Sequence, residues 1–122
     1  MAQILVVDDS EAVRNEVSKF LSDNGFTVAT AVDGKDGLDK LKSDSEVKLV
    51  ITDVNMPNMD GLTMSEKIRG DLQNTTVHIL VLTTENDANM KQRGKAAKVK
   101  GWIVKPFNGA SALGPIKTLV GS

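Results

Sequence analysis

Five short runs of aliphatic residues, separated by segments long enough to form helices, constrain the fold of this chain more than any other feature. Several runs are apolar at consecutive positions instead of alternating, as expected of strands that are covered on both faces of a parallel sheet. The runs occupy residues 4–7, 27–29, 49–51, 79–82 and 102–104. They predict five strands joined by helical crossovers.

The segments between these runs show the apolar spacing of amphipathic helices. The spacing predicts helices within residues 10–24, 38–41, 62–68, 90–99 and 113–119. Asn24-Gly25 supplies a helix stop, and Asp60 suits an N-cap. The alternation of strand and helix predicts an open α/β sheet wound on both sides.

The pair Gly114-Pro115 lies inside the last helical pattern. Proline removes a backbone hydrogen bond from the interior of a helix, at a cost of about 3 kcal/mol. We therefore expect a kink or a late start of the last helix.

The chain has 122 residues, the size of one compact domain, and contains no cysteine. Disulfides, thiolate metal sites and thiol nucleophiles are therefore excluded. The formal charge is −1, so no global field attracts nucleic acid, and no signal peptide or membrane-spanning apolar run is recognisable. We expect one cytoplasmic, monomeric domain over residues 1–122 that neither binds nucleic acid nor inserts into a membrane.

Polar side chains follow four of the five predicted strands. Asp8-Asp9 follows the first strand, Asp53 the third, Thr83-Thr84 the fourth and Lys105 the fifth. All strands of a parallel sheet end at one edge, where ligands of such sheets bind. Each residue alone has an ordinary explanation as a cap, turn or surface residue, and only their joint placement predicts a site.

Three carboxylates held together repel one another and need protons or a cation. No histidine or thiolate is close in sequence, so the predicted cation is a hard one with oxygen ligands, and Mg²⁺ fits best. A lysine and a threonine hydroxyl are suitable partners for phosphoryl oxygens. This edge therefore looks built to hold a phosphoryl group, and a carboxylate there can act as nucleophile.

Four separated motifs resemble the receiver domains of two-component response regulators. They are ILVVDDS (residues 4–10), ITDVNMPNMDG (51–61), Thr83-Thr84 and WIVKPF (102–107), in the family's order and spacing. The resemblance runs from about residue 3 to 120. It implies a flavodoxin-like (βα)5 fold with strand order 2-1-3-4-5, and one receiver domain without an output domain.

The resemblance also implies site roles. Asp53 would be the phosphoacceptor, taking the phosphoryl group from a histidine kinase. Asp8 and Asp9 would hold Mg²⁺ together with Asp53 and the backbone carbonyl of Asn55. Asn55 and Glu85 stand at positions that influence the hydrolysis of the acyl phosphate in the family.

Lys105 would bind a phosphoryl oxygen, and the resemblance implies a cis bond to Pro106. Thr83 would move its hydroxyl onto the phosphoryl group, and Trp102 stands at the position of the family's switch aromatic. Phosphorylation would draw the ring inward and reshape the face made by the fourth helix, fifth strand and fifth helix. Tryptophan is bulkier than the usual tyrosine or phenylalanine at this position.

A local basic stretch precedes the fifth strand. Its members are Lys91, Arg93, Lys95, Lys98 and Lys100. They either form a solvated helix face or dock an acidic partner beside Trp102. His78 opens the fourth strand, far from the strand ends, and we interpret it as a polar strand end.

Several functions are compatible with this site. The resemblance favours a signalling switch, not a turnover enzyme, with chemotaxis and flagellar motor control preferred over a phosphorelay intermediate that passes phosphate to a histidine phosphotransfer protein. An aspartyl-phosphate phosphatase would want a second aspartate where Asn55 stands. A flavin- or nucleotide-binding module is disfavoured because Asp8-Asp9 would repel phosphate without a metal.

Overall fold

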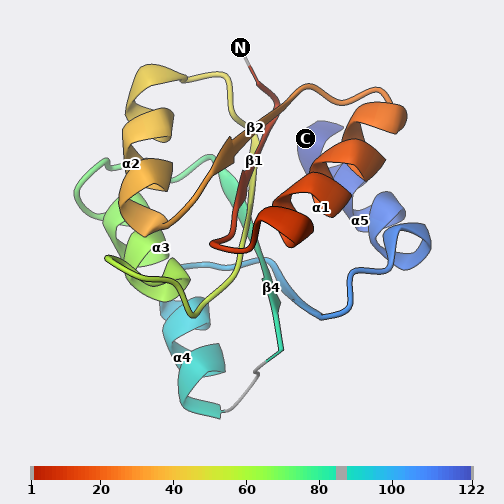
Figure 1. The fold of residues 1–122 in the computed structure, drawn as a ribbon. Helices are drawn as coiled ribbons and strands as arrows, with labels where there is room; N and C mark the ends of the chain where they lie inside the picture. Colours follow the sequence, from red (N-terminus) through yellow and green to blue (C-terminus); the bar gives the residue numbers. More distant parts are fainter. Residues whose placement is uncertain (1, 85–87, 122) are drawn as a thin grey trace.

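The computed structural model describes residues 2–84 and 88–121, which form a five-stranded parallel sheet with helices on both faces (Figure 1). The strands lie in the order β2-β1-β3-β4-β5, as predicted. They are β1 (Ile4–Val7), β2 (Val28–Ala31), β3 (Leu49–Thr52), β4 (His78–Thr83) and β5 (Gly101–Val104).

The central strands are buried along their length except at His78, which opens β4 and is half-buried, and this confirms the interpretation of the consecutive apolar runs. β2 and β5 are the edge strands, and they are only partly covered. The paired strands run in register from Ile4↔Leu49 to Val7↔Thr52 between β1 and β3. As a result, the residues that follow β1 and β3 come out side by side.

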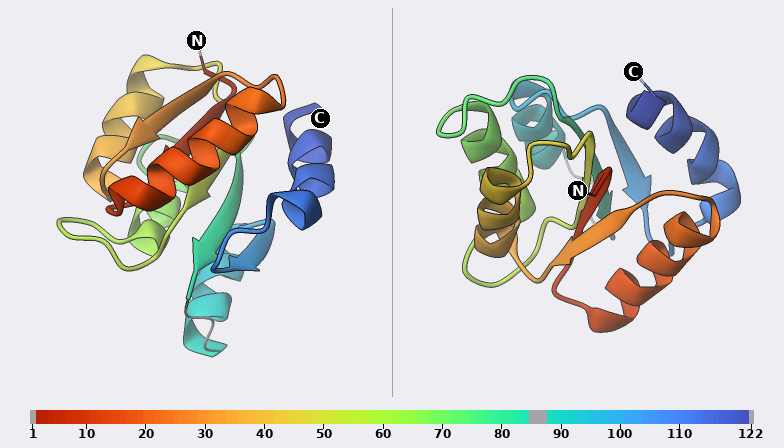
Figure 2. Two further views of the ribbon diagram at one scale, coloured as in Figure 1. Left: turned by 45° about the vertical axis from the view of Figure 1, so that its right-hand side comes forward. Right: turned by 90° about the horizontal axis from the view of Figure 1, so that it is seen from above.

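Five helices cover the two faces of the sheet (Figures 1 and 2). α1 and α5 lie on one face, and α2, α3 and α4 lie on the other. The helices are α1 (Glu11–Asp23), α2 (Gly34–Ser43), α3 (Gly61–Arg69), α4 (Ala88–Ala96) and α5 (Gly109–Gly121). Each face has its own apolar core, built from alternate residues of the same strands.

The ends of the helices follow the predicted signals. The Ser10 and Asp60 side chains accept hydrogen bonds from the first turns of α1 and α3. α1 ends at Asn24, and Gly25 takes a φ of 90°, a left-handed conformation that glycine adopts without strain. These caps place the residues that follow β1 and β3 at the N-termini of α1 and α3.

Of the two expected effects of Gly114-Pro115, a kink or a late start of the last helix, the late start is wrong. α5 begins at Gly109, six residues before Pro115, and continues to Gly121. Proline removes a single donor from the helix. The burial of Ala112, Ile116 and Val120 against the sheet outweighs that loss.

Across residues 2–84 and 88–121, none of the helices combines the length and the apolar character that crossing a bilayer requires.

Candidate functional site

The polar residues that follow β1, β3 and β5 meet at the C-terminal edge of the sheet. The backbone N–H of Asp53 donates to the carbonyl of Val7 at 3.0 Å, which holds Asp53 beside the start of the β1–α1 loop. Asp8 and Asp53 are both buried, with exposures of 1% and 8%. Buried carboxylates need charged partners, so their neighbours decide what this edge can do.

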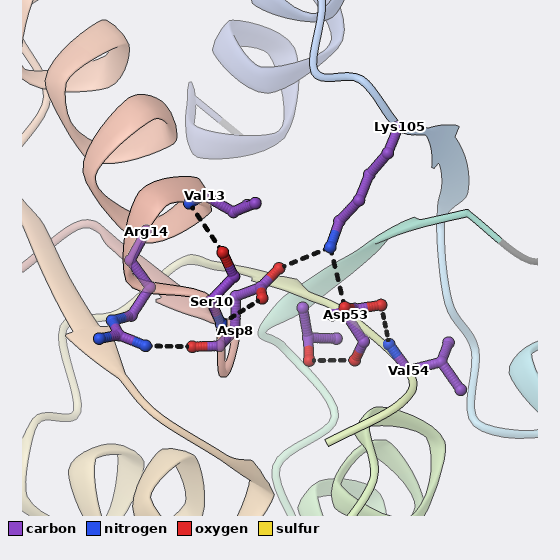
Figure 3. Close-up of polar contacts among 8 residues, drawn as sticks. Asp8, Ser10, Val13, Arg14, Asp53, Val54 and Lys105 are labelled. Carbon is purple, nitrogen blue, oxygen red and sulfur yellow. Dashed lines mark hydrogen bonds and ion pairs between the residues drawn. The ribbon is translucent and has the colours of Figure 1, made fainter.

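Lys105 reaches both carboxylates from the end of β5 (Figure 3). Its Nζ lies 2.9 Å from Oδ2 of Asp53 and 3.0 Å from Oδ2 of Asp8. The ammonium thus bridges side chains that are 45 residues apart in the chain. The Lys105–Pro106 bond is cis, as the resemblance implied.

Burial and charge act in opposite directions on the two partners. Burial raises the pKa of Asp8 above its ordinary value, and the hydrogen bonds from Ser10 and Lys105 only partly counter this effect. Burial alone would lower the pKa of Lys105, but its bonds to Asp53 and Asp8 outweigh burial and raise it. The lysine therefore stays charged, and the Asp8 carboxylate is held in an environment that favours a second cation.

The β1–α1 loop is fixed by two bonds to Asp8. The N–H of Ser10 donates to Oδ1 of Asp8 at 2.9 Å, and Nη1 of Arg14 donates to the Asp8 carbonyl at 2.7 Å (Figure 3). No sequence pattern pointed to Arg14, because its partner is a backbone oxygen six residues earlier. Arg14 therefore joins the site as a residue that sequence reasoning missed.

The turn after β3 presents Asp53 in one orientation. The N–H of Val54 donates to Oδ1 of Asp53 at 2.7 Å, and Oδ2 faces Lys105. The N–H of Gly61 donates to the carbonyl of Val54 at 2.9 Å and closes the turn. A Cβ on Gly61 would lie 1.9 Å from the Asp53 carbonyl oxygen, so only glycine allows this approach.

One carboxylate oxygen from each of Asp8, Asp9 and Asp53 lies within 4.8 Å of the others. Asp9 is exposed and Asp8 is buried, so the cluster opens toward solvent on one side. Oxygen donors of this kind suit a hard divalent cation. The three carboxylates therefore fit Mg²⁺. Asn55, which the resemblance implied as a further ligand, is exposed in the turn two residues after Asp53.

The two predicted switch residues lie on neighbouring strands. Thr83 is buried at the end of β4, and its carbonyl accepts from the N–H of Lys105 at 2.9 Å. Trp102 of β5 pairs with Val81 of β4 and packs on the face that carries α3 and α4. Glu85 lies outside the described residues.

The site geometry has counterparts in known proteins. The family model of the response regulator receiver domain matches residues 4–114. The chain belongs to the response regulator receiver family. Receiver domains are signalling modules that interact with histidine kinases and downstream targets, and they bind Mg²⁺ at an acidic pocket.

The relatives of this receiver include chemotaxis proteins. Chemotaxis protein CheY1 of Helicobacter pylori is 37% identical over 106 residues, which cover 86% of each chain. Response regulator MprA of Mycobacterium tuberculosis is 40% identical over 105 residues, but the match covers only 44% of that longer protein. The structure of chemotaxis protein CheY4 of Vibrio cholerae superimposes with a TM-score of 0.88 at 41% identity and covers 98% of both chains.

Proposed function

We propose that this receiver is a phosphoacceptor switch in which Asp53 takes a phosphoryl group from a histidine kinase. The observation that supports this most strongly is the bridge from Lys105 to Asp53 and Asp8 at 2.9 and 3.0 Å. It brings a fixed positive charge to the carboxylate that would act as nucleophile. A positive charge that is already in position stabilises the negative charge on the oxygens of the phosphoryl group during transfer.

The transfer exchanges one bond for another. One carboxylate oxygen of Asp53 attacks phosphorus, the P–N bond of the phosphohistidine breaks, and the imidazole leaves with the electron pair. Oδ1 of Asp53 already accepts from Val54, and Lys105 is free to follow the phosphoryl oxygens from Oδ2. Catalysis on this proposal consists of alignment and charge neutralisation.

Asp8, Asp9, Asp53 and the Asn55 carbonyl would hold Mg²⁺. When bound, the ion neutralises the phosphoryl oxygens and orients them toward Asp53. Arg14 and Ser10 keep the Asp8 backbone and carboxylate in place for that role.

The readout would pass from Thr83 to Trp102 and to the face formed by α4, β5 and α5. A hollow of about 810 Å³ lies between β5 and α5, lined by Trp102, Ile103, Pro115 and Leu119 among others. Val104 beside it is 54% exposed. An apolar hollow next to the switch ring is a suitable surface for a downstream protein.

The chemotaxis names of several relatives favour control of a flagellar motor for this chain. The alternative is a phosphorelay intermediate that passes phosphate to a histidine phosphotransfer protein. On either reading the chain acts as a single receiver domain, monomeric and cytoplasmic. Asn55 and Glu85 would tune the lifetime of the acyl phosphate.

Trp102, the only tryptophan, makes the proposal testable by fluorescence. We expect a saturable change in emission on adding Mg²⁺ and then beryllofluoride, abolished in Asp53→Asn and by a chelator. Unchanged emission, together with no phosphoryl gain by intact mass, would contradict the proposal.

A pull-down with and without beryllofluoride separates the two roles. Recovery of a histidine phosphotransfer protein in place of a motor component would overturn the proposed role in chemotaxis.

A further inference from the structure

The N-terminal edge of the sheet, opposite Asp53, carries a row of basic side chains. Lys48 directly precedes β3, His78 opens β4 and Lys100 directly precedes β5, and these strands are neighbours. The N–H of His78 donates to the carbonyl of Lys48 at 2.9 Å, and the N–H of Lys100 donates to that of Ile79 at 2.8 Å. Because neighbouring strands lie about 4.8 Å apart, the row spans about 10 Å.

The positive charges in this row act on one another. Burial lowers the pKa of His78, and the charges of Lys100, Arg69 and Lys48 lower it further. Like charges gathered in this way repel, and an anion would relieve the repulsion.

The lysines of the row lack ion pairs. Lys98, two residues before Lys100, belongs to the row as well, and its carbonyl accepts from Nη2 of Arg69 at 3.3 Å. Within residues 2–84 and 88–121, none of Lys48, Lys98 and Lys100 pairs with a carboxylate. In contrast, Arg93 of α4 pairs with Glu66 of α3 at 3.0 Å. The three lysines are all exposed, so their charges are available to a partner.

Arg69 fixes the surface beneath the row. Its guanidinium donates to the carbonyls of Val77 at 2.6 Å and Ala97 at 2.9 Å, which ties the end of α3 to the segments before β4 and after α4. The carbonyls satisfy its hydrogen bonds but leave its charge in place. A partner would therefore meet a preformed surface.

Acidic residues lie beside the Lys48 end of the row. Glu46 lines a hollow of about 550 Å³ together with Thr76, His78 and Lys48. Asp44 accepts hydrogen bonds from the backbone N–H groups of Ala2 and Glu46, so it is engaged locally. The acidic part of a partner would run from Lys48 away from Glu46, toward β5.

We propose that Lys48, His78, Lys98 and Lys100 form a docking surface for an extended acidic segment of a partner protein. Alternate side chains of an extended segment lie about 7 Å apart, so about two or three carboxylates match the row. A single phosphate is too small to reach across three strands. The row also contains no phenylalanine, tyrosine or tryptophan on which nucleobases could stack, and this disfavours nucleic acid as the partner.

The position of the row predicts when a partner can dock there. Because it lies at the edge of the sheet opposite Asp53, docking there is independent of phosphorylation. The surface would hold a partner near the receiver before and after the switch at the other edge. Its failure would leave the proposed phosphoacceptor role untouched.

His78 is the only histidine of the chain, so NMR of its imidazole reports on the row directly. The probe is an octaglutamate peptide added to labelled protein at low salt over a series of pH values. We expect a saturable shift of the His78 signal and a higher His78 pKa with peptide, since an anion favours the protonated ring. By linkage, the peptide binds more tightly as the pH falls through that pKa.

Lysine substitutions locate the effect. Lys48→Ala and Lys100→Ala should each weaken peptide binding about twofold to fivefold, as expected for exposed ion pairs. Lys35→Ala, an exposed lysine of α2 at the opposite edge, and Asp53→Asn should leave it unchanged.

Three results would overturn the proposal. A His78 signal that octaglutamate does not move, or binding that ignores both lysine substitutions, would show that the row is only solvated. Saturation by inorganic phosphate at the same concentration would identify a small-anion site instead. Tighter binding of an RNA oligonucleotide than of the peptide would identify a nucleic-acid surface.

Discussion

A Cβ atom on Gly94 would lie 2.7 Å from Cζ2 of the Trp102 indole, so α4 rests on the ring only because residue 94 has no side chain. Gly94 is the one buried residue of α4. The indole also packs with Leu62 and Val81, and it is thereby held between the helix and the sheet. Helix and ring must move together if the ring changes position.

Gly94→Ala should push the indole or α4 aside. Overpacking costs about 1–3 kcal/mol, while alanine stabilises a helix relative to glycine by up to about 1 kcal/mol, so we expect a net loss of about 1 kcal/mol. Urea unfolding and the emission of Trp102 measure both effects. Gly121→Ala is the control, because its Cβ would meet no atom within 4 Å. Unaltered stability and emission in Gly94→Ala would refute this contact.

Lys105→Ala should separate metal binding from phosphoryl binding. The ammonium lies 3.0 Å or less from Asp8 and Asp53, so it repels a cation that approaches the same carboxylates. We expect Mg²⁺ to bind about threefold to tenfold more tightly in the variant, while beryllofluoride binds more weakly. Fluorescence titration of Trp102 checks both, and weaker Mg²⁺ binding would show that Lys105 instead holds the carboxylates in position.

The raised pKa of Asp8 predicts how metal affinity depends on pH. Protons compete for this carboxylate at a higher pH than for an ordinary aspartate of pKa 3.8, so Mg²⁺ affinity should begin to fall earlier on acidification. The folded protein also binds this proton more tightly than the unfolded chain, so Asp8 makes the metal-free protein gain stability as the pH falls through the raised pKa.

Asp8→Asn is the matched variant for this prediction. It cannot titrate, so its weaker Mg²⁺ binding should change less between neutral and acidic pH than that of the wild type. Titrations at a series of pH values compare the two proteins. Parallel profiles would mean that another group controls the pH dependence.

Arg14→Ala should loosen the β1–α1 loop. The lost bond from Nη1 to the Asp8 carbonyl at 2.7 Å corresponds to about 1–2 kcal/mol, and part of this should appear as weaker Mg²⁺ binding. Isothermal titration measures the affinity, and Arg14→Lys should restore part of it. Lys19→Ala, which removes an exposed ion pair with Asp23, should change neither affinity nor stability measurably.

The sequence predicted the sheet well because its strands are buried on both faces. The runs around Val6, Val50 and Val81 are apolar at every position, and their shortness and β-branched residues favour buried strands over helices. The strand ends followed directly, so the meeting of Asp8, Asp53 and Lys105 was predictable from topology alone.

Contacts to backbone atoms were not predictable. Arg14 acts on a carbonyl and Gly94 acts by having no side chain, so neither leaves a signature in residue type or spacing. The early start of α5 at Gly109 was not predicted with certainty, because local propensity at Pro115 was weighed without the tertiary contacts of Ile116. The basic row at the N-terminal edge of the sheet could be predicted only from the strand register, which places Lys48 and Lys100 on either side of His78.

The tight turn at Gly61 has a consequence for heritable variation. A library that samples every amino acid at Gly61 should keep a single survivor in a screen for folding, because any side chain would displace the Asp53 carbonyl. Asp53 itself should tolerate asparagine in that screen and fail only in a screen for signalling. Selection thus acts on the two neighbours at different stages, on Gly61 as the chain folds and on Asp53 once it is folded.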